Sequence, residues 1–159
     1  MLTNRPVWGI RSGGEYFDAS SVFKSGYIGI GWSDLGDLSK LPADQSDIKK
    51  HLMVTHQKHT DITLHRFEQG AGALYHFKYV MQDGDIVVYE DKPTGKTYIG
   101  TVDGSYKYDR SVSADAPHLR PVKWKHKYPS SSIRTRLTQR GQTLWEIRNP
   151  QEFRDLMED

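Results

Sequence analysis

The sequence predicts one α+β domain, in which helices flank a curved, mostly antiparallel sheet or small barrel. Two observations support this class. Six or seven short apolar or alternating segments are separated by turn residues, and helical patterns are inserted early in the chain. The 159 residues suit a single domain over residues 1–159, because two would be cramped. Hydrophobic residues make up 36% and charged residues 26%, which is the balance of a folded globular protein.

The first half of the chain alternates strands with helices. Asp18 and Ser46 are suitable N-caps for two helices, because their side-chain oxygens can accept from free backbone N–H groups. A third segment repeats apolar residues at helical spacing, although Gly70 and Gly72 weaken the pattern in its middle. The expected elements are strands at 7–11 and 27–32 and helices at 18–24, 47–55 and 62–81.

The second half reads mostly as strands. Residues 86–89 are all apolar or aromatic, which predicts a central strand. A turn-rich stretch at 91–96 then predicts a hairpin. Pro121 places its strand at an edge or a strand start. The expected strands are 86–89, 97–102, 105–109, 120–124 and 143–147, followed by a helical turn at 133–137 and a C-terminal helix from Pro150.

Positive charge is concentrated in one third of the chain. Between His118 and Arg148 there are eight Lys and Arg residues against Glu146 alone, a local charge of +7 that leaves −5 on the remaining residues. Such asymmetry is the electrostatic footprint of a protein that binds a polyanion, or else a solvated surface that maintains solubility. Trp124 and Tyr128 are interleaved with these cations, which favours nucleic acid.

Composition and motifs exclude several classes of function. The chain has no cysteine, so disulfides, thiolate metal sites and thiol nucleophiles are excluded. It has no run of about 20 apolar residues and no apolar leader at its start, so we expect a cytoplasmic protein with no membrane partner. Neither a phosphate-binding P-loop nor a G-x-S-x-G nucleophile elbow is present.

One string imitates a metal-dependent nuclease. Asp85, Glu90 and Lys92 supply two carboxylates and a lysine, as metal-dependent phosphate cleavage requires. The two carboxylates are an odd number of residues apart on one strand, however, so they should point to opposite faces. We therefore interpret the string as a hairpin. His56 and His59 are three residues apart on a helical stretch, which is a weak metal signal. We expect no metal, no cofactor and no catalytic residue.

Five blocks together resemble a known family. They are WGIRSGGEYFDASSVFKSGYIGIGW (8–32), GIGWSDLGDLS (29–39), GALYHFKYVMQDGDIVVY (72–89), TYIGTVDGSYKYD (97–109) and HLRPVKWK (118–125). In their order they resemble the N-terminal domains of Mrr-type and other modification-dependent restriction proteins, of the EVE/PUA-like superfamily. The first block is also similar to part of the YTH domains.

The resemblance implies a small twisted β-barrel flanked by helices. It also implies a pocket for a modified base, 5-methyl- or 5-hydroxymethylcytosine, that is flipped out of duplex DNA. By motif position the pocket would comprise Trp32 as a wall, Ser33 and Asp34 at the base edge, Ser12 at the mouth and Tyr89 as the opposing wall. Asp34 can accept from the N4 amino group of cytosine, which disfavours thymine. The expected phosphate contacts are Arg11, Arg120, Lys123, Lys125, Lys127, Arg134 and Arg136.

No nuclease segment accompanies these blocks. We therefore expect a non-catalytic reader that directs a separate or fused restriction nuclease, as a partner subunit or domain. Two alternatives remain open besides the compact nuclease. One is an RNA-binding module of the PUA or YTH type that reads a modified base. The other is a protein-interaction domain whose basic surface serves only solubility.

Overall fold

The computed structural model describes residues 5–10, 20–58, 61–137 and 143–158. Its strands are β1 (Val7–Ile10), β2 (Tyr27–Ile30), β3 (Ile86–Asp91), β4 (Lys96–Val102), β5 (Lys107–Tyr108), β6 (His118–Pro129) and β7 (Leu144–Glu146). They form one sheet in the order β2-β6-β4-β3-β1-β7, with β5 paired to β6. Every pair is antiparallel except β1 with β3. The α+β class and the mostly antiparallel sheet are therefore confirmed.

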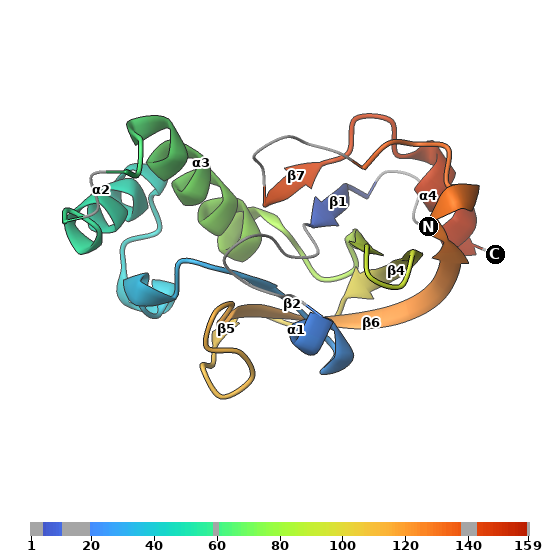
Figure 1. Cartoon of the computed structure of the whole chain (residues 1–159), viewed down its shortest axis with the longest axis horizontal. Coiled ribbons are helices and arrows are strands. Elements are labelled where there is room, and N and C mark those ends of the chain that lie inside the picture. Colours follow the sequence, from blue (N-terminus) through green and yellow to red (C-terminus); the bar gives the residue numbers. More distant parts are fainter. Residues whose placement is uncertain (1–4, 11–19, 59–60, 138–142, 159) are drawn as a thin grey trace.

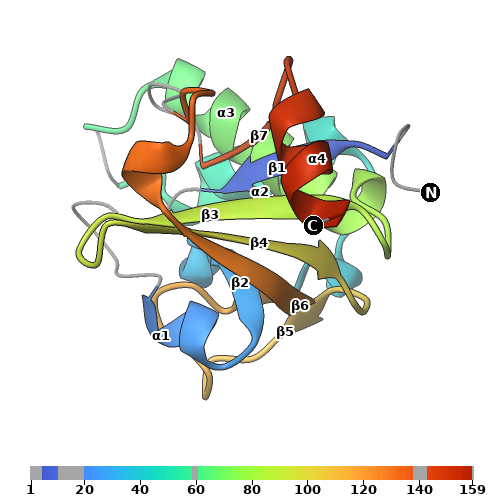
Figure 2. The ribbon, with the colours of Figure 1, turned by 90° about the vertical axis from the view of Figure 1, so that its right-hand side faces the viewer.

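The sheet curls without closing. Within the described residues, β2 and β7 lie at its two ends, and the long strand β6 links the pair with β2 to the pair with β4 (Figure 2). The result is a half-barrel rather than a closed barrel. The expectation that Pro121 marks an edge or a strand start is wrong, because β6 pairs with β2 and β4 and Pro121 is its fourth residue. A proline lacks the N–H that an inner strand usually donates.

Helices cover both faces of this sheet. They are α1 (Ser20–Lys24), α2 (Gln45–Thr55), α3 (Leu64–Tyr75) and α4 (Gln151–Glu158), with a π-helical extension η3 (His76–Val80) directly after α3. Three short 3-10 turns are η1 (Ser33–Leu35), η2 (Leu38–Lys40) and η4 (Ser130–Ser132). α2 and α3 lie together at one end of the molecule, away from α4 (Figure 1). Among the described helices, none has the length and apolar character that crossing a membrane requires.

Alternating residues of β3 show how the two faces are filled. Val87 and Tyr89 belong to the larger core cluster, which also contains buried side chains of α2 and α3. Ile86 and Val88 belong to a second cluster with Phe153 and Met157 of α4. Both faces of the strand are buried, which explains its continuous apolar sequence and confirms its prediction as a central strand.

Two local predictions are wrong. The N-cap of α2 is Asp44 instead of Ser46, because the Asp44 carboxylate accepts from the backbone N–H groups of Ser46 and Asp47. Residues 133–137 do not form a helical turn. They have no regular secondary structure, and the Glu152 carboxylate of α4 accepts from the N–H groups of Arg134 and Thr135 and from the Thr135 hydroxyl.

Candidate functional site

Trp32, the predicted pocket wall, has an unusual backbone conformation. It follows β2 at the start of η1 with φ 64° and ψ 43°, the left-handed region. Among the described residues it is the only non-glycine with positive φ. A bulky residue in this region is disfavoured, and strain of this kind concentrates at functional sites. The surrounding structure must therefore stabilise Trp32 in this conformation.

A buried histidine provides that stabilisation. The Nε2 atom of His118 lies 3.1 Å from the Trp32 carbonyl oxygen, which can only accept, so Nε2 carries the proton. His118 Nδ1 then accepts from the Tyr106 hydroxyl at 2.7 Å, and that hydroxyl accepts from the Leu38 N–H at 3.1 Å. Burial lowers the pKa of His118 to about 4, so the ring is neutral near pH 7.

The indole of Trp32 packs on the helical hairpin. A Cβ atom at Gly70 would lie 2.7–2.8 Å from three indole atoms, so the ring rests directly on the backbone of α3. His56 meets the ring edge-on at 5.2 Å between centroids, and Phe67 lies at 6.0 Å. This contact explains the glycine in the middle of α3. Trp32 remains only partly buried, so its outer part is free to meet a ligand.

Ser33 and Asp34 lie beside Trp32, as their positions in the chain require. The Ser33 carbonyl accepts from the Tyr108 hydroxyl at 2.9 Å, a second hydrogen bond that fixes the backbone at η1. The Asp34 side chain is 66% exposed, with one carboxylate oxygen 3.7 Å from Nε2 of His56. An exposed carboxylate next to a partly exposed indole can accept from the amino edge of a stacked base.

Tyr89 belongs to a different aromatic group. It is 2% exposed and stacks on Phe23 at 5.0 Å, and Tyr98 and Trp124 complete the group. Tyr89 is paired with Tyr98 of β4, and Tyr98 is paired with Lys127, near the end of β6. β2, which leads to Trp32, is paired instead with the start of β6. The structure thus does not bring Tyr89 and Trp32 together as opposing walls. The predicted residues Arg11 and Ser12 lie outside the described residues.

The three lysines of β6 do not share one face. β6 is irregular opposite Ile99 and Gly100, which makes Lys125 an extra residue in the strand. Lys123 is paired with Thr101 and Lys127 with Tyr98. Paired residues point to the same face, and those two partners are an odd number apart, so Lys123 and Lys127 point to opposite faces. Lys125 donates instead to the Met157 carbonyl at the end of α4, where a cation is favourable.

Other predicted phosphate contacts remain on the surface. Lys123, Lys127, Arg134 and Arg136 are all exposed. Glu152 fixes the backbone beneath Arg134. Burial alone would raise the pKa of Glu152, but hydrogen bonds from Arg134 and Thr135 outweigh burial and lower it. We call these four cations together the exposed basic group, although they are not on one face: Lys123 and Lys127 point to opposite faces of β6, and Arg134 and Arg136 lie on the segment after η4.

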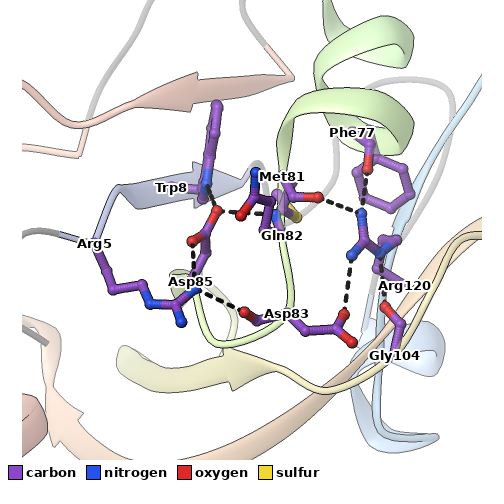
Figure 3. Close-up of polar contacts among 9 residues, drawn as sticks. All are labelled: Arg5, Trp8, Phe77, Met81, Gln82, Asp83, Asp85, Gly104 and Arg120. Carbon is purple, nitrogen blue, oxygen red and sulfur yellow. Dashed lines mark hydrogen bonds and ion pairs between the residues drawn. The ribbon is translucent and has the colours of Figure 1, made fainter. Parts of the chain in front are cut away.

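The prediction that Arg120 contacts a phosphate is wrong, because its side chain is 3% exposed and cannot reach a phosphate from this position. Its Nη1 donates to the carbonyls of Phe77 at 2.9 Å and Met81 at 2.8 Å, and its Nε donates to the carbonyl of Gly104 at 2.8 Å (Figure 3). Its Nη2 lies 3.3 Å from Asp83. We call these contacts the Arg120 network.

The carboxylate of the nuclease-like string is also used by the fold. Asp85 is 2% exposed and accepts from Trp8 Nε1 at 3.1 Å and from the Gln82 N–H at 2.9 Å, with Arg5 at 3.6 Å (Figure 3). The string lies on the β3–β4 hairpin, as predicted. Within the described residues, no three His, Asp, Glu or Cys side chains are arranged to hold a metal ion.

Sequence reasoning missed His118 as a site residue and misplaced Arg120, yet the alternation of β6 contained the signal. His118, Arg120, Val122 and Trp124 have the same parity, so they point to one face, and two of them are apolar or aromatic. Lys123 has the opposite parity. A strand that begins at residue 118 would have placed the side chains of His118 and Arg120 on the buried face of the sheet.

Comparison with known proteins gives a family but no function. The family model described as a domain of unknown function, DUF8426, matches residues 8–147, so the chain belongs to that family. The matched segment contains both β2 with Trp32 and β6 with His118. No curated protein matches the chain, and no solved structure matches it either.

Proposed function

We propose that this protein is a non-catalytic reader of modified cytosine in DNA, and that Trp32 and Asp34 contact the base after it has left the double helix. The observation that carries the proposal is the left-handed conformation of Trp32, which a buried neutral histidine maintains beside an exposed carboxylate. The strained conformation presents a partly exposed indole, the kind of surface on which bases stack.

The order of elements supports a distant relation to the EVE/PUA-like superfamily. A strand, a short helix and a strand ending in Gly-Trp precede a helical hairpin and a curled sheet. The exposed basic group supports a polyanionic ligand. In the described part of the chain, Lys123, Lys127 and Arg136 form no ion pair, so these cations are available to phosphates. In this proposal the protein acts in the cytoplasm, and a separate or fused nuclease performs any cleavage.

The free energy gained by stacking the base is of the same order as the cost of extracting it from the duplex. Extracting a base costs a few kcal/mol, and stacking on an aromatic ring returns about 1–3 kcal/mol. The Asp34 carboxylate then selects cytosine over thymine through the N4 amino group. A methyl or hydroxymethyl group adds one small contact, so discrimination from pocket fit alone should be about 10–200-fold.

A binding titration at fixed salt tests the proposal. The ligands are one duplex whose central cytosine is plain, 5-methylated, 5-hydroxymethylated or glucosylated, with an N6-methyladenine duplex and a matching RNA. Wild-type protein should prefer one cytosine form. Equal weak binding to every duplex would refute the reader, and tighter binding to the RNA would favour the RNA-binding alternative instead.

Two variants locate the base contact. Asp34→Asn should reduce the preference for the modified cytosine, while Asp115→Asn, which removes another exposed carboxylate after β5, should leave it unchanged. Trp32→Ala should lose the preference but keep binding to plain DNA through the basic group. Thermal melting of each variant separates a lost contact from a lost fold. Undiminished discrimination in both Trp32→Ala and Asp34→Asn would show that the base is read elsewhere.

A further inference from the structure

A second aromatic surface lies close to Trp32. It consists of Tyr75, Lys78 and Tyr79 at the end of the α3–η3 helix and Tyr106 between β4 and β5, and we call it the tyrosine platform. All four side chains are half-buried. The rings of Tyr75 and Tyr79 have centroids 5.3 Å apart. The Lys78 ammonium lies 4.8 Å from the ring centroids of both Tyr79 and Tyr106, within cation–π range.

The platform is connected to the Trp32 backbone by hydrogen bonds. The Tyr106 hydroxyl contacts His118 Nδ1, and His118 Nε2 donates to the Trp32 carbonyl. Two hydrogen bonds thus separate a platform ring from the strained residue. The buried histidine therefore couples the position of Tyr106 to the backbone conformation of Trp32.

The Arg120 network holds the platform in place. Lys78 and Tyr79 lie in the π-helical turn, and such turns are rare and often found at functional sites. Arg120 donates to the carbonyl of Phe77, inside this turn, and to the carbonyl of Met81, directly after it (Figure 3). A buried guanidinium therefore fixes the backbone that carries these half-buried rings.

Charged groups of both signs lie at the platform. Asp37 is the nearby carboxylate, and one of its oxygens accepts from the Ser39 N–H. Burial, together with Tyr75 and Asp37, raises the pKa of Tyr79 further above its ordinary value of 10. The rings are thus uncharged stacking surfaces, and Lys78 places a cation between two of them. An aromatic surface with one cation fits a base and its phosphate.

We propose that the tyrosine platform stacks a second, unpaired base adjacent to the modified cytosine, with Lys78 near its phosphate. The proposal rests on the proposed function, because it takes the ligand to be the same DNA. Stacking on aromatic rings is tolerant of sequence, since every base has a π face. The platform therefore adds affinity for an opened duplex, while Trp32 and Asp34 select the base.

A scan with abasic sites tests the platform. The ligand is the duplex that the wild-type protein binds best, with one nucleoside at a time replaced by an abasic site on either side of the modified cytosine and opposite it. Wild-type binding should weaken about 5–150-fold at one position, the equivalent of one stacked base. Tyr79→Leu should weaken binding to the intact duplex by a similar factor and lose its sensitivity to that position.

Matched variants separate the explanations. Tyr79→Phe keeps the ring and should bind like wild type. Tyr27→Leu should also bind like wild type; it removes another half-buried tyrosine with a lysine, Lys107, 5.0 Å from its ring centroid. If Tyr79→Leu fails to fold, Lys78→Met tests the same surface and should weaken binding. In one outcome the wild-type protein prefers modified cytosine, while Tyr79→Leu and wild type lose the same binding affinity at every abasic position. That result refutes base stacking on the platform and leaves the proposed function standing. If the wild type prefers no cytosine form, both fail.

Discussion

Replacing Arg120 with methionine should destabilise the protein strongly. The change keeps an apolar stem of similar length but removes all four polar contacts of the Arg120 network. The carbonyls of Phe77, Met81 and Gly104 would lose their donor, whereas Asp83, 68% exposed, would be hydrated. An unsatisfied buried acceptor costs about 1–3 kcal/mol, and releasing the guanidinium from its buried position offsets part of the total. We expect a loss of about 3–5 kcal/mol in the free energy of unfolding.

Urea denaturation followed by tryptophan fluorescence measures this loss, with Lys123→Met as the control. Lys123 is exposed on the same strand, so its replacement should change the free energy of unfolding by less than about 0.5 kcal/mol. The same pair of variants decides whether Arg120 contacts DNA directly. If Arg120→Met unfolds like wild type and instead weakens DNA binding, Arg120 is a phosphate contact and the network argument is refuted.

Three further outcomes are expected. Gly70→Ala should lower the free energy of unfolding by about 1–3 kcal/mol, because the new Cβ atom overlaps the Trp32 indole. Gly72→Ala places its Cβ atom near only the flexible end of Gln45, so this variant should be neutral or stabilising. Urea denaturation of both variants measures the difference. The folded-state pKa of His118 is about 4, below its unfolded value of about 6.5, so the unfolded chain takes up more protons between these pH values. The contribution of His118 to the free energy of unfolding is complete above pH 6.5 and should fall by roughly 3 kcal/mol as the pH drops towards 4. If the stability of a His118→Gln variant depends on pH as steeply as that of the wild type, this reasoning is wrong. Glu152→Ala should release the backbone at Arg134 and speed tryptic cleavage after Arg134 and Arg136, which mass spectrometry detects; an unchanged cleavage rate would contradict it.

Patterns that depend on one element were predictable from the sequence. The apolar run of β3 identified a strand buried on both faces, and the apolar spacing in 62–81 identified the helix that covers the larger core. The hairpin between β3 and β4 followed from its turn residues. In each case the local periodicity and the tertiary burial agree.

Features set by contacts between distant residues were not predictable. The extra residue Lys125 in β6 depends on how that strand pairs with β4, and no local signal marks it. The left-handed Trp32 depends on His118, which is far along the chain. Motif position predicts Tyr89 as a pocket wall, but in the fold Tyr89 stacks on Phe23 of α1. The candidate site was thus located by the sequence at η1, while its supporting residues required the fold.

The contact between the first and last parts of the chain has a consequence for topology. Arg154 of α4 donates to the Arg5 carbonyl at 2.9 Å, and β1 is inserted between β3 and β7. Arg5 and α4 therefore lie together on one side of the molecule, opposite the α2–α3 hairpin (Figure 1). A short peptide joining them would allow a circular permutant opened elsewhere. That junction would lie on the far side of the molecule from the helices that support Trp32 (Figure 1).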